Sequence, residues 1–188
     1  MKMAFFSFLL LLLAPSSSPL AQTPAKTTPP KETIAWSAQR PLTWADFKSR
    51  SIAMEQLAAL TASNIDVQVG CTDFVFRSTV KAVFMPTESW VRDAKSASPA
   101  LLRHEQLHFD LTELHARMLR QKLSLVKLDC QHLNPAFNNL TKAAFAAWQR
   151  EESRYDGETN HGLNAEKQKF WETQVQLRLN QLTAFAQE

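Results

Sequence analysis

Residues 98–118 have the sequence SPALLRHEQLHFDLTELHARM and carry the strongest structural signal in the chain. After Ser98 and Pro99, large apolar side chains recur at the spacing of one face of an α-helix. This apolar stripe consists of Leu101, Leu107, Leu111, Leu114 and Met118. At a helical step of about 100° per residue, His104 and His108 point in the same direction as the stripe. The sequence therefore predicts a long helix that turns two histidines towards the protein interior.

Two further helices are expected downstream of this one. Asn134 and Pro135 form a favourable helix start, because asparagine caps well and proline suits the first turn. A third helix is expected to begin near Asn164. The apolar positions at helical spacing are Phe137, Leu140, Ala144 and Trp148 in the second helix, and Trp171, Val175, Leu182 and Phe185 in the third.

The residues upstream of the first helix alternate between apolar and polar, which is typical of half-buried strands. The alternating apolar positions are Ile65, Val67, Val69, Phe74, Phe76, Val80, Ala82 and Phe84. We expect a hairpin turn at 70–73 and the end of the sheet at Pro86. The segment 36–47 is expected to form an irregular opening strand and a short turn. A small antiparallel sheet followed by three helices defines an α+β fold.

The N-terminal residues resemble an export signal rather than part of the fold. Lys2 precedes an apolar run from Phe5 to Leu13 that is too short to span a bilayer, and Ala21 offers a cleavage position. We expect a signal peptide over 1–21, a flexible Thr/Pro/Lys-rich leader over 22–35, and a single domain over 36–188. No other segment is long and apolar enough to cross a membrane, so the mature protein is expected to be periplasmic or secreted.

Charge and cysteine content restrict the function further. The formal net charge is only +3, which gives no electrostatic case for nucleic-acid binding. Cys71 and Cys130 lack the spacing of a redox motif, and in an exported chain they predict a structural disulfide.

The chemistry suggested by the first helix is zinc binding. His104 and His108 stand one helical turn apart, so both can offer a ring nitrogen to one Zn²⁺ ion, while Glu105 can hold and deprotonate a metal-bound water as the catalytic base. Two unpaired imidazoles on an apolar face would be costly to bury. The simpler alternative is that both histidines are core residues hydrogen-bonded to the backbone.

Catalytic zinc usually has three protein ligands, and the first helix does not supply a third. His115 lies ~10 Å along the helix from His108. Glu113 points to the other side and suits a surface ion pair with Arg117, and Asp110 shares that outward side.

The third ligand is therefore sought further along the chain. His132 is expected to be an ordinary loop histidine. Residues 155–162, YDGETNHG, are polar and contain two glycines, so we expect a loop that projects His161 onto the metal, with Asp156 as the alternative ligand. Asp156 is otherwise expected to orient a ligand histidine, and Tyr155 is a candidate for the same supporting role or for donating to an oxyanion.

Several blocks of the sequence resemble the bacterial family catalogued as domain of unknown function 922. They are LLRHEQLHFDLTEL (101–114), YDGETNHG (155–162), Gln168 with Trp171, and RPLTWADF (40–47). The resemblance runs from about Trp36 to Leu182. It implies a secreted, zincin-like zinc peptidase with His104, Glu105 and His108 at its core. The family's Asp-x-x-Thr-x-His-Gly block falls on Asp156, Thr159, His161 and Gly162.

The expected function is thus that of an exported zinc-dependent hydrolase, a metallopeptidase acting on a peptide or protein substrate. An extended substrate is expected to pair with an edge strand at Val80–Phe84. The alternative is a non-catalytic exported module that is stabilised by zinc or binds peptides. A closed site with four protein ligands would favour that alternative.

Overall fold

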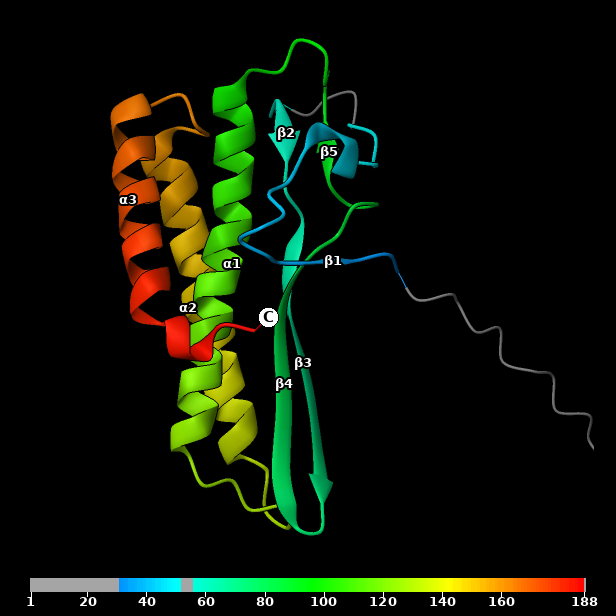
Figure 1. Cartoon of the computed structure of the whole chain (residues 1–188), viewed down its shortest axis with the longest axis vertical. Helices are drawn as coiled ribbons and strands as arrows, with labels where there is room; N and C mark the ends of the chain where they lie inside the picture. Colours follow the sequence, from blue (N-terminus) through cyan, green and yellow to red (C-terminus); the bar gives the residue numbers. More distant parts are fainter. Residues whose placement is uncertain (1–30, 52–55, 188) are drawn as a thin grey trace, which may run out of the picture. The chain divides into compact units, whose positions relative to one another are not determined.

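The computed structural model of the protein describes residues 31–51 and 56–187. The predicted signal peptide and residues 22–30 of the predicted leader lie outside the described residues. The order of elements after residue 30 is that of an α+β domain with a small antiparallel sheet followed by three helices, as expected. Figure 1 shows the three helices on one side of a long β-hairpin.

The hairpin consists of β3 (Ser63–Thr72) and β4 (Val75–Phe84). The two strands pair antiparallel along their whole length, from Ser63 opposite Phe84 to Thr72 opposite Val75. The predicted turn at 70–73 was placed too early, since Gly70 pairs with Arg77 inside the ladder. The turn lies at Asp73 and Phe74, which both have positive φ angles, so Phe74 is a turn residue and not a strand residue.

The sheet begins earlier than the sequence suggested. Ile34 and Ala35 form β1 (Ile34–Ala35), which pairs with Phe84 and Val83 of β4. The expected leader boundary at residue 35 is therefore too late. β1 also makes β4 the central strand of the order β1-β4-β3, so the predicted free edge at Val80–Phe84 is wrong.

A second, two-stranded sheet was not foreseen. It pairs β2 (Ala59–Leu60) with β5 (Trp90–Val91). The segment after β1 contains a short 3₁₀ helix, η1 (Trp44–Asp46), in which Asp46 accepts hydrogen bonds from Thr43.

The central element is α1 (Pro99–Leu125), which contacts the hairpin as well as both other helices. Ser98 caps α1 by accepting a hydrogen bond from the Leu101 amide. α2 (Ala136–Thr159) begins one residue later than expected, with Pro135 in the capping position. α3 (Ala165–Gln181) begins near Asn164, as predicted, and Asn164 caps it. It ends before Leu182 and Phe185, which were expected in this helix, and a short 3₁₀ helix, η2 (Thr183–Phe185), follows.

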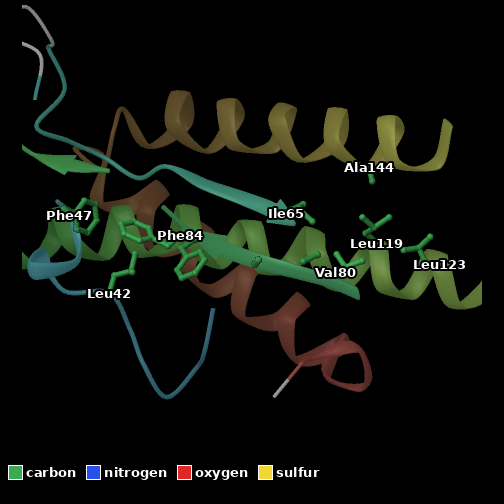
Figure 2. Packing of buried hydrophobic residues seen from close by; sticks show 11 residues of the cluster. Leu42, Phe47, Ile65, Val80, Phe84, Leu119, Leu123 and Ala144 are labelled. Carbon is green, nitrogen blue, oxygen red and sulfur yellow. The ribbon is translucent and has the colours of Figure 1, made fainter. Parts of the chain in front are cut away.

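Two apolar clusters fill the interior on either side of α1. Figure 2 shows part of the first, in which Phe84, Val80 and Ile65 of the hairpin pack against α1 residues such as Leu119. The second lies between α1 and α3, and consists of Leu107, Leu111, Leu114, Tyr155, Trp171, Val175 and Leu179. The predicted apolar stripe of α1 thus faces α3, and the histidines beside it lie at the junction of the three helices.

The Glu113–Arg117 pair forms as predicted, with 2.8 Å between Glu113 Oε1 and Arg117 Nε. It is buried, however, and not a surface pair. Arg120 joins it at 3.0 Å, and the two arginines donate to the carbonyl oxygens of Leu179 and Phe185. The network therefore ties the end of α3 and η2 to α1.

The predicted disulfide between Cys71 and Cys130 is present. It links the tip of the hairpin to the segment between α1 and α2, and such bonds persist outside the reducing cytoplasm. None of the helices in the described part of the chain has the length and apolarity needed to span a membrane.

A candidate metal site where three helices meet

His104 and His108 meet at the centre of the site because α1 places them one turn apart on its inner side. Their Nε2 atoms are 3.3 Å from each other. His104 is 2% exposed, while His108 is slightly more open. The prediction that this pair faces the interior is confirmed.

The third member of the group is Asp156, from the last turns of α2. Its Oδ1 atom lies 3.2 Å from His104 Nε2 and 3.3 Å from His108 Nε2. Ligand atoms about 2.0–2.2 Å from a tetrahedral zinc ion lie about 3.3–3.6 Å apart, so this triangle has the size of one face of such a site. Within 31–51 and 56–187, this is the one cluster of at least three His, Cys, Asp or Glu side chains able to hold a metal.

The other ring nitrogen of His104 is held by two buried side chains. Its Nδ1 lies 2.7 Å from the Tyr155 hydroxyl and 3.2 Å from Gln168 Oε1, and the hydroxyl in turn donates to Gln168 Oε1 at 2.8 Å. An Nδ1–H donating into this network leaves the lone pair of Nε2 directed at His108 and Asp156.

His108 is oriented in the same way by Glu152. Its Nδ1 lies 2.5 Å from Glu152 Oε2, and Trp148 Nε1 donates to the other carboxylate oxygen at 2.9 Å. Sequence reasoning missed Glu152. The spacing of Trp148, Glu152 and Asp156, four residues apart along one helix, is the signal that could have found it.

The electrostatics of the group favour a positive charge at its centre. Burial alone would lower the pKa of His108, but hydrogen bonds to Asp156 and Glu152 outweigh it and raise this pKa to about 10. Burial would raise the pKa of Asp156, yet its contacts with His104 and His108 hold this pKa well below the usual range. When the Nδ1–H groups of both histidines donate outward, lone pairs on His104 Nε2, His108 Nε2 and Asp156 Oδ1 face one another. Because lone pairs repel, this arrangement becomes favourable only with a proton or a metal cation between them.

A tight left-handed turn connects α2 to α3 beside the group. Asn160, His161 and Gly162 all have positive φ angles. A Cβ atom on Gly162 would lie 2.9 Å from both Cβ and Cγ of His104. Glycine is therefore required there both by the backbone conformation and by the close approach to the histidine.

A cavity of about 510 Å³ opens next to the three clustered atoms and is lined by His104, His108 and Asp156. Glu105 also lines it. Thr61 is the residue after β2, and its hydroxyl donates a hydrogen bond of 2.7 Å to the Glu105 carboxylate. The Glu105 carboxylate, between the two histidines in the sequence, is thus fixed at the wall of the cavity and not directed at solvent.

The predicted loop at 155–162 is wrong in its first half. Residues 155–159 form the end of α2, and Tyr155 is 0% exposed. Its hydroxyl lies on the Nδ1 side of His104, away from the cavity, which fits a supporting role and not an oxyanion donor.

His161 lies at the edge of the group and not inside it. Its Nδ1 is 3.2 Å from Asp156 Oδ1, and its side chain is 51% exposed. The geometry therefore favours Asp156, the alternative ligand of the sequence analysis, as the third member.

The remaining candidates lie elsewhere. His132 is exposed and contacts Asp129, His115 pairs with Glu151 at 2.7 Å, and Asp110 accepts from Trp36 Nε1. None of the three joins the group, as the sequence analysis predicted.

Fold and site together define an α+β domain with a three-residue candidate metal centre beside a cavity. The family model described as "Bacterial protein of unknown function (DUF922)" matches residues 55–162. This is more than half of the chain, and the protein belongs to this family, which confirms the family resemblance over these residues. The matched region contains the three clustered residues, Glu105 and the 56–61 wall of the cavity. Comparison with curated proteins and with solved structures gives no match.

Proposed function

We propose that the protein is an exported zinc-dependent hydrolase that cleaves peptide bonds. The observation that carries the proposal is the triangle of His104, His108 and Asp156 lone-pair atoms, which opens onto a cavity also lined by Glu105. Two imidazoles and one carboxylate are a donor set that suits zinc, and catalytic zinc sites use three protein ligands.

When bound, zinc would acidify a water molecule and polarise a substrate carbonyl. Glu105 would take the proton of that water and pass it to the leaving amine. Its carboxylate is held by Thr61 at one oxygen, which leaves the other oxygen for the water. Glu152, Tyr155 and Gln168 would keep the imidazoles in the metal-binding tautomer.

A non-catalytic zinc-stabilised or peptide-binding module is the competing function. A structural zinc site has four protein ligands, whereas the cluster found among the described residues has three members. The free corner of the site and the neighbouring carboxylate of Glu105 therefore favour catalysis.

Two measurements on the purified mature chain test the proposal. Elemental analysis should give one zinc per chain, and a mixture of unstructured peptides should be cleaved by the wild type but not by Glu105→Gln. The matched control is Glu166→Gln, on the exposed first turn of α3. Stoichiometric zinc with no cleavage by any of the three proteins would favour the non-catalytic module, and no zinc after reconstitution would exclude both the hydrolase and the zinc-stabilised module.

We also propose that the protein is exported to the periplasm or the medium, with the signal peptide removed after Ala21. The Cys71–Cys130 disulfide supports a compartment outside the cytoplasm. Mass spectrometry of the protein recovered from the periplasm or medium should give a chain beginning at Gln22, whereas a full-length cytoplasmic chain would contradict export.

A further inference from the structure

We propose that the substrate is an internal, extended segment of polypeptide that pairs with the free edge of β2 and places an apolar side chain in the cavity. This inference rests on the proposed hydrolase function and names its substrate class.

The edge of β2 has unused backbone groups. Leu60 pairs with Trp90, and the Arg92 amide donates to the Ala58 carbonyl at 2.9 Å, so residues 58 and 60 direct their backbone groups towards β5. Because these groups alternate along a strand, the N–H and C=O of Ala59 point away from β5. Neither makes a hydrogen bond to another residue in the described ranges. Such an edge is a template for an added strand.

This edge faces the candidate metal site. The hydroxyl of Thr61, the residue after β2, donates to the carboxylate of Glu105 on α1 at 2.7 Å and lies 3.2 Å from the Glu105 carbonyl oxygen. In Figure 1, β2 lies between β5 and α1. Ala59 itself lines the cavity together with His104 and His108. A chain paired with Ala59 would therefore run past the ligand group and bring a backbone carbonyl to it.

The side-chain preference follows from the cavity wall. Apart from the site residues, the wall is largely aliphatic, and its leucines are Leu57, Leu60, Leu101 and Leu163. Leu163 is 81% exposed, so the mouth presents apolar surface that would be removed from water when an apolar side chain binds. This predicts a preference for leucine, phenylalanine or methionine.

The same wall argues against recognition of a chain end. A terminal carboxylate calls for a cationic partner, and the described residues that line the cavity include no lysine or arginine. A terminal amine calls for a carboxylate, but Glu105 and Asp156 are already assigned to the water and the metal. The cleaved bond is thus expected to lie inside the chain.

The test is cleavage-site mapping by mass spectrometry, with the zinc-loaded mature chain and a peptide library prepared from a whole proteome. The expected sites are internal, depend on Glu105, and show one flanking position enriched in apolar residues roughly tenfold, as the burial of such a side chain implies. Glu105-dependent cleavage without an apolar preference, or removal of single terminal residues, would overturn this inference but leave the hydrolase intact. Absence of Glu105-dependent cleavage would overturn both.

Two pairs of variants test the wall and the edge separately. Leu163→Ser should weaken the apolar preference several-fold, while Leu177→Ser, an exposed leucine on α3 outside the cavity, should not. Ala59→Pro removes one outward N–H and should lower kcat/KM roughly tenfold, whereas Val91→Pro on the opposite edge should leave it near the wild-type value.

Zinc affinity and Tm should stay close to wild type in these variants, which shows that they are folded. Since Ala59 is buried, Leu163→Ser tests the cavity at an exposed position if the proline variant does not fold. Wild-type specificity and kcat/KM in folded Leu163→Ser and Ala59→Pro would contradict the proposed binding mode.

Discussion

Replacing Gly162 by alanine should destabilise the fold and weaken the metal site together. The new Cβ atom would lie 2.9 Å from two atoms of the His104 side chain, and the residue has φ of +81°. A left-handed conformation costs a non-glycine residue roughly 1–2 kcal/mol, and overpacking costs about 1–3 kcal/mol. We therefore expect a loss of about 2–5 kcal/mol in the free energy of unfolding.

The matched control is Gly157→Ala, five residues earlier on α2. No heavy atom lies within 4 Å of a Cβ at that position, and its φ is not positive. Alanine in a helix is favoured over glycine by roughly 0.5–1 kcal/mol, so this variant should be slightly more stable than the wild type.

Urea unfolding of the metal-free proteins measures both changes, and chelator competition then gives their zinc affinities. Gly162→Ala should have the lower stability and the weaker affinity, because its Cβ displaces His104. If the two alanine variants were equally stable and bound zinc equally well, the packing of Gly162 on His104 would not matter for either property.

Three further results are expected. Glu152→Gln should lower zinc affinity roughly 10–100-fold without unfolding the protein, because the carboxylate that orients His108 is lost, and chelator competition would contradict this with an unchanged affinity. Zinc affinity should increase with pH between 6 and 8, since the pKa of His108 is raised to about 10 without metal and binding must displace its proton, whereas a pH-independent affinity would refute the cluster's electrostatics. Burial would raise the pKa of Glu151, but contacts with His115 and Arg178 outweigh it and lower this pKa to about 2. The stability that ionised Glu151 contributes is therefore fully present above its ordinary pKa of 4.5 and is lost as pH falls towards 2. The difference in unfolding free energy between wild type and Glu151→Gln should shrink over that window, and a constant difference would contradict this role of Glu151.

The helices and the disulfide could be predicted from the sequence because their signals are local or compositional. The apolar stripe of α1, the helical spacing after Asn164 and the even cysteine count each pointed to one structure. The sequence likewise predicted that His104 and His108 lie side by side, since two residues four positions apart on a helix have little geometric freedom.

The third residue of the candidate metal site could not be chosen in the same way. Gly157 and the polar residues around it suggested a loop, but α2 continues through them to Thr159 and carries Asp156 towards His108. Tertiary packing of Tyr155 against α1 and α3 stabilises this last turn, and helix propensity does not report such packing.

The short strands could not be predicted from the sequence pattern either. β1, β2 and β5 each have two residues, which is too short for alternation to be recognised. Their pairing nevertheless decides which edges are free. β1 pairs with β4, while the outward backbone groups of Ala59 in β2 have no hydrogen-bond partner among the described residues.

The most direct test of the account is a crystal structure of the mature chain with bound zinc. We predict one ion held by His104 Nε2, His108 Nε2 and an oxygen of Asp156, with the remaining position open to the cavity beside Glu105. Coordination by His161 in place of Asp156, or by four protein ligands with the cavity closed, would contradict it.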